Sequence, residues 1–248
     1  MTNIKPVSVA NLPQNNVCHA VVSGEYPKLI AELERIGIIP LPTSACTDIM
    51  PQVSYHADML FSHLGGKRYL LDKSQASLKS MLDNLGFLCE GDLIDLQKEY
   101  PLDSILNAAM FDKRLICGKQ SEDYFVNYVD EIIEVKQGYS KCSICPVNDN
   151  SLITDDASVF KACTVAGFDV LLVSKGSVLL KGFDYGFIGG CCGKIAPDTI
   201  AFFGNLKTHY DYQKIESFLI ERGVYPLSLS TGSLIDVGSI LPITEYRK

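Results

Sequence analysis

A unit of about 45 residues recurs roughly five times along the chain, and this repeat constrains the fold more than any single motif. Each unit contains an amphipathic helix, a short hydrophobic strand and two further apolar strands. A unit of this size buries too little surface to fold alone, so the units must share one core.

A hydrophobic strand is expected just after each helix. These strands are predicted within residues 35–41, 84–90, 128–135, 166–173 and 222–227. Four of them are led by a glycine, namely Gly37, Gly86, Gly167 and Gly223. A glycine directly after a helix suits the left-handed residue that ends it, so each glycine predicts a helix end.

Two more strands are expected in each unit. The predicted pairs are 56–61 with 68–71, 105–110 with 114–117, 144–147 with 151–154, 186–188 with 199–203, and 234–236 with 240–243. The pattern predicts an α/β fold in which five modules close into a pseudo-fivefold α/β propeller, with the helices outside. The alternative is an ordinary open α/β sheet. We expect one domain, 1–248, in which residues 1–24 form an N-terminal extension or the first strand.

The composition is that of a globular protein with an acidic balance. Of the 248 residues, 47% are hydrophobic and 21% charged, and the formal net charge is −7. Clustered lysines and arginines are missing, which argues against nucleic acid as a partner. No apolar run is long enough to cross a membrane and no secretory signal is evident, so a cytoplasmic location is expected. An acidic pocket would favour a small cationic metabolite.

Nine cysteines in a chain without a secretion signal are expected to be reduced thiols. Cys142 and Cys145 form half of a zinc signature, which Cys191, Cys192 or His209 could complete. Because a second close cysteine pair is missing, we expect no metal and no cofactor. The glycine-rich segment 186–194 also departs from the nucleotide-binding loop pattern, since Ile188 and Ile195 stand where that pattern has Gly and Ser or Thr.

The sharpest local signal lies between Tyr55 and Leu71. If residues 56–61 form a strand, the two-residue period places His56 and Asp58 on one face and His63 on the other. An imidazole and a carboxylate would then share one pocket, although a purely structural role for both residues is an equal alternative.

The repeat and the His56-x-Asp58 pair, followed by Phe61 and Gly65-Gly66, resemble the guanidino-group-modifying superfamily, the penteins. The resemblance extends over residues 25–246 and is to a bacterial branch known only by its fold. It implies five helix-and-strand modules in a ring. It also implies a reaction in which a Cys thiolate attacks a guanidinium carbon, a His moves protons and carboxylates hold the cationic substrate.

The sequence departs from the family at the nucleophile. The active enzymes carry the catalytic Cys in a Gly-rich segment near the C-terminus, and the corresponding residues 234–246 contain no Cys. The predicted replacements are Cys191 and Cys192, in a segment where Lys194 could lower a thiol pKa. A tight turn without catalytic function is the alternative for this segment.

Four polar residues at the ends of inner strands are candidates for substrate binding: Asn107, Asn148, Asp149 and Asp236. Turn and strand-end roles are the competing interpretation for all four. Two functions therefore remain open. One is an enzyme acting on a guanidino or amidino C–N bond, and the other is a non-catalytic module of the same fold that binds a metabolite or a protein partner, as ribosome anti-association members of the superfamily do.

Overall fold

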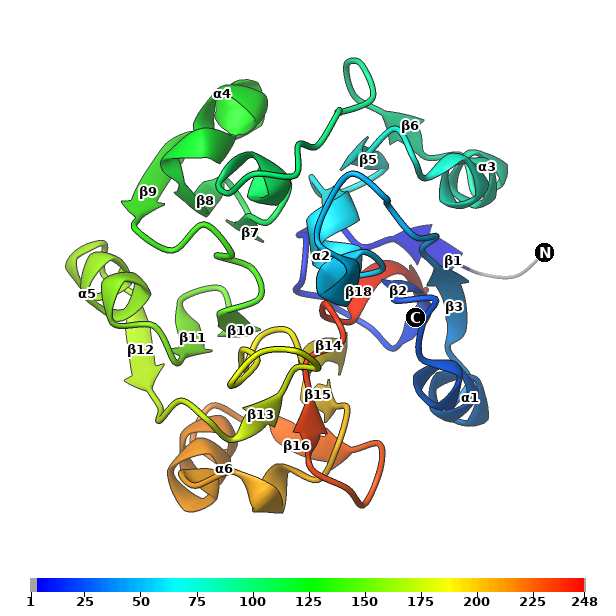
Figure 1. Ribbon diagram of the computed structural model, residues 1–248. Coiled ribbons are helices and arrows are strands. Elements are labelled where there is room, and N and C mark those ends of the chain that lie inside the picture. The colour runs from blue at the N-terminus through cyan, green and yellow to red at the C-terminus, as the bar shows by residue number, and fades with distance from the viewer. Residues whose placement is uncertain (1–3, 248) are drawn as a thin grey trace.

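The structure is a computed structural model that describes residues 4–247 of the chain (Figure 1). The expected domain limits, residues 1 and 248, lie outside the described part. Within it, the strands form five sheets of three or four strands and one further two-stranded pair. The expectation of a mixed α/β fold is confirmed. The sheets are separate from one another and do not join into one closed sheet.

The strand order shows that the two ends of the chain meet in one sheet. That sheet has the order β1 (Ile4–Pro6), β18 (Leu241–Tyr246), β2 (Val17–Val22) and β3 (Ile39–Pro42). The next two sheets are β4 (Phe61–His63), β5 (Arg68–Leu71) and β6 (Leu88–Cys89), and β7 (Ala109–Phe111), β8 (Arg114–Gly118) and β9 (Glu131–Val135). The last two are β10 (Ile144–Asn148), β11 (Ser151–Thr154) and β12 (Asp169–Leu172), and β14 (Cys192–Ala196), β15 (Thr199–Phe202) and β16 (Tyr225–Ser228). Strand β13 (Val178–Leu179) pairs with β17 (Leu234–Ile235).

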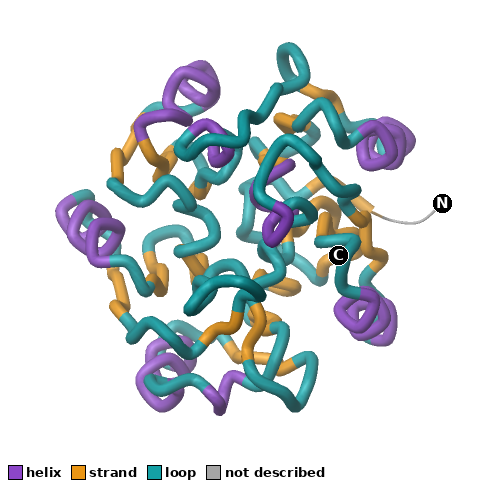
Figure 2. Tube along the Cα trace, in the orientation of Figure 1, coloured by secondary structure: helices purple, strands orange, loops and turns teal. Residues whose placement is uncertain are grey.

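Each three-strand unit contains one antiparallel and one parallel pairing. In the second sheet, for example, β4 is antiparallel to β5, and a helical crossover then places β6 parallel to β5. The crossover helices are α1 (Pro27–Arg35), α3 (Ala76–Asn84), α4 (Glu122–Phe125), α5 (Ala157–Val165) and α6 (Tyr212–Ile220). These five helices lie at the periphery, and strands and loops lie inside them (Figures 1 and 2).

The glycines predicted to end helices do so in the structure. Gly37, Gly86, Gly167 and Gly223 all have positive φ, between 67° and 85°. The helices bury the faces that the sequence pattern predicts, as Leu29 and Leu33 of α1 are fully buried. A glycine lowers the cost of the left-handed residue because it has no Cβ. Helix α4 lacks this glycine and has a single turn flanked by 3₁₀ turns at 119–121 and 126–128.

Three strand predictions are wrong. Residues 56–61 do not form a strand, because Ala57–Leu60 form the helical turn α2 and only Phe61 enters β4. Ala, Met and Leu favour a helix, and they dominate this run. Segment 186–188 is a loop: the N–H groups of Phe187 and Ile188 donate to the carboxylates of Asp236 and Asp155, and the Gly186 N–H donates to the Val178 carbonyl. Of segment 105–110, only the last two residues reach β7.

Residues 1–24 contain elements of the first sheet. Strand β2 pairs with β18 on one side and with β3 on the other. A first strand was one of the two expectations for residues 1–24, whereas strands β13 and β14 were not expected. Among residues 4–247, no helix has the length and apolar character needed to cross a membrane.

Candidate active site

Helix α2 positions two side chains at the centre of the molecule. His56 precedes the helix in an extended conformation, and Asp58 lies in its first turn. The Asp58 backbone N–H donates to the Gly238 carbonyl at 3.1 Å, which ties α2 to the last loop of the chain. Gly238 has a φ of +75°, and a Cβ there would collide with His56. Only a glycine therefore allows the two segments to approach so closely.

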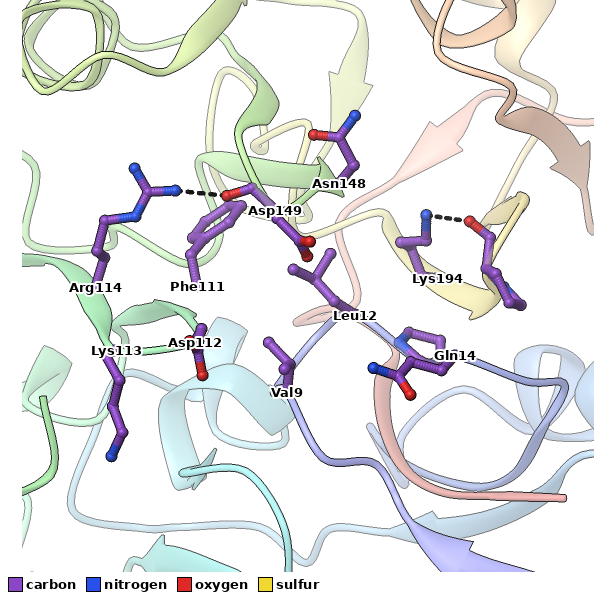
Figure 3. A pocket seen from close by; sticks show the side chains of 12 residues that line it. Val9, Leu12, Gln14, Phe111, Asp112, Lys113, Arg114, Asn148, Asp149 and Lys194 are labelled. Carbon is purple, nitrogen blue, oxygen red and sulfur yellow. Dashed lines mark hydrogen bonds between the residues drawn. The ribbon is translucent and has the colours of Figure 1, made fainter. Parts of the chain in front are cut away.

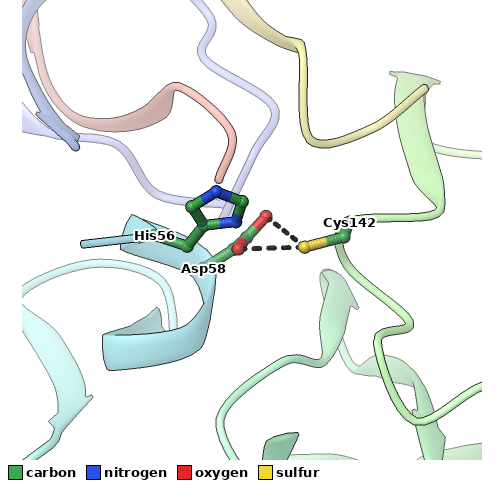
Figure 4. A group of neighbouring side chains, drawn as sticks. All are labelled: His56, Asp58 and Cys142. Atoms are coloured by element: carbon green, nitrogen blue, oxygen red, sulfur yellow. Dashed lines mark hydrogen bonds between the residues drawn. The ribbon is translucent and has the colours of Figure 1, made fainter. Parts of the chain in front are cut away.

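Cys142 provides a thiol at this place. Its Sγ lies 3.1 Å from each carboxylate oxygen of Asp58, and the geometry has the thiol donating to that carboxylate. His56, Asp58 and Cys142 each offer a ligand-type atom within 4.8 Å of the others (Figure 4). Cys142 lies just before β10, which begins at Ile144, so the third residue of the cluster is distant in sequence from His56 and Asp58.

The segment between β17 and β18 contributes Asp236 and Ser239. Asp236 Oδ1 lies 3.7 Å from His56 Nδ1. The Ser239 hydroxyl lies 2.5 Å from Asp58 Oδ2 and 3.0 Å from the Gly189 carbonyl oxygen. It also accepts a hydrogen bond of 3.0 Å from the Lys141 ammonium group. Two carboxylates, one ammonium group, an imidazole and a thiol therefore meet in one place.

Burial controls the protonation of this group. His56, Asp58 and Asp236 are at most 1% exposed. Burial lowers the pKa of His56, although the nearby Asp58 opposes the shift. Burial also raises the pKa of Asp58, and it raises the pKa of Asp236 to about 6. The pKa of the Cys142 thiol is raised well above its usual value by burial and by the neighbouring Asp58 and Asp236 carboxylates. The resting thiol is therefore protonated.

The cluster is closed to solvent in this structure. A cavity of about 10 Å³ borders Asp58 and Lys141, and its wall also includes Asn11, Phe61, Leu106 and Pro242. This volume is enough for roughly one water molecule. A metabolite therefore requires the surrounding loops to open before it can reach the cluster.

Of the eight predicted site residues, four lie in the central group. These are His56, Asp58, Asn107 and Asp236, and Asn107 contacts both Asp58 and Cys142. His56 and Asp58 do meet, but through a helical turn and not through strand alternation.

The aromatic ring of Phe187 contacts the rings of both Tyr139 and Tyr185.

Cys191 and Cys192 are buried among apolar side chains, with thiols that donate to the carbonyls of Ile188 and Gly189. Burial raises both thiol pKa values well above normal. Lys194 was expected to lower the pKa of one of these thiols, but its ammonium group donates instead to the carbonyls of Val147 and Pro197, each at 2.6 Å. The thiol that contacts Asp58 is that of Cys142.

Asn148 and Asp149 lie in a different place. They line a surface pocket of about 590 Å³ together with Leu12, Phe111 and Lys194 (Figure 3). The carbonyl of Asp149 accepts a hydrogen bond from Arg114 at 2.6 Å. Asn148 closes the β10–β11 turn by accepting from the Asn150 backbone N–H at 3.0 Å. The observed contacts of Asn148 and Asp149 therefore agree with the interpretation that they are turn residues.

Sequence reasoning did not select Lys141, Cys142 or Ser239 for the site. The Cys142-x-x-Cys145 spacing singled out Cys142, but only as part of a zinc signature. Ser239 lies in the segment in which the family's Cys was sought, and its φ of +69° is unusual for a residue other than glycine. That backbone conformation could not be predicted from the sequence.

Comparison with known proteins gives a family without an assigned function. Residues 21–241 match the model of DUF6873, a family of unknown function. The chain belongs to this family. No curated protein matches it.

Solved structures that resemble the chain have very different sequences. Agmatine deiminase from C. jejuni aligns with a TM-score of 0.57 and 9% identity, covering 99% of this chain and 96% of that one. SxtG, an amidinotransferase from Microseira wollei in the saxitoxin biosynthetic pathway, aligns at 0.56 and 9%, covering 94% and 97%. Inosamine-phosphate amidinotransferase StrB1 from Streptomyces griseus aligns at 0.53 and 12%, covering 93% and 96%. At these identities the comparison shows the fold alone, and that fold is the pentein-like fold of guanidino-modifying proteins.

Proposed function

We propose that this protein is an enzyme that acts on a guanidino or amidino C–N bond of a small cationic metabolite. The observation that carries the proposal is the meeting of His56, Asp58 and Cys142 within 4.8 Å, with Asp236 beside them. The finer description of the fold as a five-module pseudo-fivefold propeller is part of this proposal. It is supported by five sheets that each contain one parallel pairing, with one antiparallel pairing in the three-stranded sheets and two in the four-stranded sheet.

The carboxylates favour a cation. Asp58 and Asp236 are almost completely buried, and within residues 4–247 the positively charged side chain that contacts this group is that of Lys141. A guanidinium ion could donate hydrogen bonds to both carboxylates and would offset the remaining negative charge. Such a planar cation suits two carboxylates better than a single ammonium group does.

The thiol provides the nucleophile in this proposal. Cys142 already donates to Asp58, so that carboxylate can accept the proton as sulfur attacks the guanidinium carbon. Collapse of the tetrahedral adduct breaks a C–N bond, and His56 passes to the departing amine the proton that Asp58 took from the thiol. Water or an acceptor amine then attacks the carbon and gives a proton to His56, and that proton returns to sulfur as the C–S bond breaks. A bound cation also makes the thiolate less costly, because it counters the two carboxylates.

The nucleophile predicted at Cys191 or Cys192 is thereby assigned to Cys142 in the proposal. Asn107 is proposed to hold the thiol, and Asp236 to hold the substrate. A reducing compartment such as the cytoplasm would keep a reactive thiol free.

The test is turnover and covalent labelling of the full chain under reducing conditions. The protein is incubated with arginine, agmatine and methylated arginines, ureido product is measured, and a haloamidine is used to label the nucleophile. We expect product from at least one substrate and a label on the Cys142 peptide, both lost in Cys142→Ala. Cys145→Ala is the matched control, since Cys145 is also buried and lies three residues away. Absence of both product and label would refute the proposal. A label on Cys191 or Cys192 would show that this cysteine, and not Cys142, is the nucleophile.

A non-catalytic binding module is the second candidate. The observation in its favour is that Ser239, and not a cysteine, contacts Asp58 from the last loop. In this case the same carboxylates bind a cationic metabolite, or the fold binds a protein partner, without bond cleavage. Thermal shifts with the same compounds, in the absence of product, would support this function, whereas clear turnover would end it.

A further inference from the structure

We propose that His56, Asp58 and Cys142 form a binding site for a divalent ion of the zinc type. Figure 4 shows the Cys142 side chain pointing toward the Asp58 carboxylate, with the His56 ring beside that carboxylate. The inference uses residues of the proposed active site but does not rest on the proposed reaction. The sequence led us to expect no metal, and the proposal replaces that expectation. It also differs from the zinc signature considered there, because the ligands beside Cys142 are His56 and Asp58 and not Cys145.

The imidazole is the observation that points to a ligand. His56 is fully buried, and neither ring nitrogen has a hydrogen-bond partner among the described residues. A buried polar group without a partner is costly, and the large majority of such groups are satisfied by protein, water or an ion. The nitrogen, the thiol sulfur and a carboxylate oxygen all lie within 4.8 Å of one another.

The donor types fit zinc. Zinc in proteins binds imidazole nitrogen, thiolate sulfur and carboxylate oxygen, and three protein ligands with a fourth open position are common. At bond lengths of about 2.0–2.3 Å, tetrahedral ligand atoms lie roughly 3.3–3.8 Å apart. Cys142 Sγ is already 3.1 Å from the Asp58 oxygens, so the side chains need only small movements.

The fourth position also has candidates. Asp236 Oδ1 lies 3.7 Å from His56 Nδ1, and the Asp236 carboxylate is itself fixed by the backbone N–H groups of Phe187 and Gly238 at 2.9 and 3.1 Å. The cavity of about 10 Å³ beside Asp58 offers a position for one water molecule. Either oxygen completes a four-coordinate set.

The charges agree with one divalent ion. Two carboxylates and the Lys141 ammonium group leave the buried cluster with one negative charge when the thiol is protonated. Binding of Zn²⁺ forms a metal–sulfur bond and releases the thiol proton to solvent, so the site becomes neutral. A guanidinium ion would neutralise the same cluster, and the two cations therefore compete for one position.

Cobalt(II) is the direct probe for this site, because a thiolate–cobalt bond gives a charge-transfer absorption band. We expect the full, reduced chain to bind one equivalent of Co²⁺ with this band, and Zn²⁺ to displace it. Apparent affinity should rise up to about tenfold per pH unit, since one proton is released. Cys142→Ser should abolish the band, and His56→Gln should weaken binding at least about tenfold.

Cys145→Ser is the matched control and should keep the band. A band that survives Cys142→Ser, or that disappears only in Cys145→Ser, would overturn the assignment. So would the absence of a band in the unchanged protein. Because variants of buried residues can fail to fold, alkylation of the unchanged protein is followed by peptide mapping. Zn²⁺ should slow labelling of Cys142 at least about tenfold, and equal labelling with and without Zn²⁺ would contradict the site. These readouts contain no turnover, so failure of the metal site and failure of the enzymatic proposal are separate results.

Discussion

The side-chain amide of Asn107 contacts Cys142 through both of its polar atoms. Its Oδ1 accepts the Cys142 backbone N–H at 3.1 Å, and its Nδ2 lies 3.2 Å from Sγ. The same oxygen accepts the Lys141 N–H at 2.7 Å, and the same nitrogen donates to the Asp58 carbonyl at 3.1 Å. One amide therefore fixes the thiol relative to the helical turn that carries Asp58.

Replacement of Asn107 by alanine is expected to destabilise the fold by about 2–4 kcal/mol. The change leaves the Lys141 and Cys142 N–H groups buried without an acceptor, and each such group costs about 1–3 kcal/mol. Urea denaturation gives the free energy of unfolding. Asn127→Ala is the control, since Asn127 is exposed, and it should change stability by less than about 0.5 kcal/mol. Similar losses in both variants would show that Asn107 does not have this role.

Gly190 is expected to be indispensable for the position of Asp236. A Cβ at residue 190 would overlap the Asp236 carboxylate, so that carboxylate would have to leave the N–H groups of Phe187 and Gly238. Gly190→Ala should therefore cost about 1–3 kcal/mol in urea denaturation. Gly232→Ala adds the same methyl group where nothing lies within 4 Å and should be nearly neutral. A neutral result at Gly190 would contradict the close packing.

Much of the fold could be predicted because its signals are local. A glycine after an amphipathic run can end a helix without any contact from the rest of the chain. Gly37 and Gly86 are examples. Segment 56–61 shows where local reasoning fails, because a short run can follow either the helical or the strand period. Its helical form is stabilised by a contact with Gly238, which the sequence does not reveal.

The site was predictable only in part, because its residues meet through tertiary structure. His56 and Asp58 are neighbours in sequence, so their pairing was visible. Cys142 lies 84 positions from Asp58, and Ser239 lies 181 positions from it. Eight of the nine cysteines are buried, and no local pattern separates the thiol beside a carboxylate from those that fill apolar space.

Thiol reactivity is expected to single out Cys89. This residue is partly exposed, whereas the other eight cysteines are buried. Burial raises the pKa of the Cys89 thiol and raises those of Cys142, Cys191 and Cys192 well above the usual value, so access of the reagent is the main feature that sets Cys89 apart. A chromogenic disulfide at pH 8 should report one fast equivalent, with the others reacting only as the chain opens. Cys89→Ser should remove the fast phase and Cys163→Ser should keep it. A fast phase of several equivalents would contradict the buried placement.

The loop beside the cluster is held by two carboxylates, and its stability is expected to depend on pH. Asp155 Oδ2 accepts the Ile188 N–H at 3.0 Å, and Asp236 Oδ2 accepts the Phe187 N–H at 2.9 Å. Burial raises the pKa of Asp155 to about 7. The folded state therefore binds the Asp155 proton more strongly than the unfolded state does. Between about pH 4 and 7 this group makes folding less favourable as pH rises, because the buried carboxylate becomes charged.

Asp155→Asn removes this titration but keeps an oxygen that can accept the Ile188 N–H. The stability of the variant relative to the unchanged protein should therefore increase by about 1–3 kcal/mol between pH 5 and pH 8, since each unit of pKa shift corresponds to about 1.4 kcal/mol. His56 titrates in both proteins, so its contribution cancels in the difference. Urea denaturation at each pH measures the difference in the free energy of unfolding between the variant and the unchanged protein. Asp130→Asn, at an exposed position, is the control, and its difference should stay nearly constant with pH. If the Asp155→Asn difference is flat or falls with pH, the buried carboxyl does not titrate in this range.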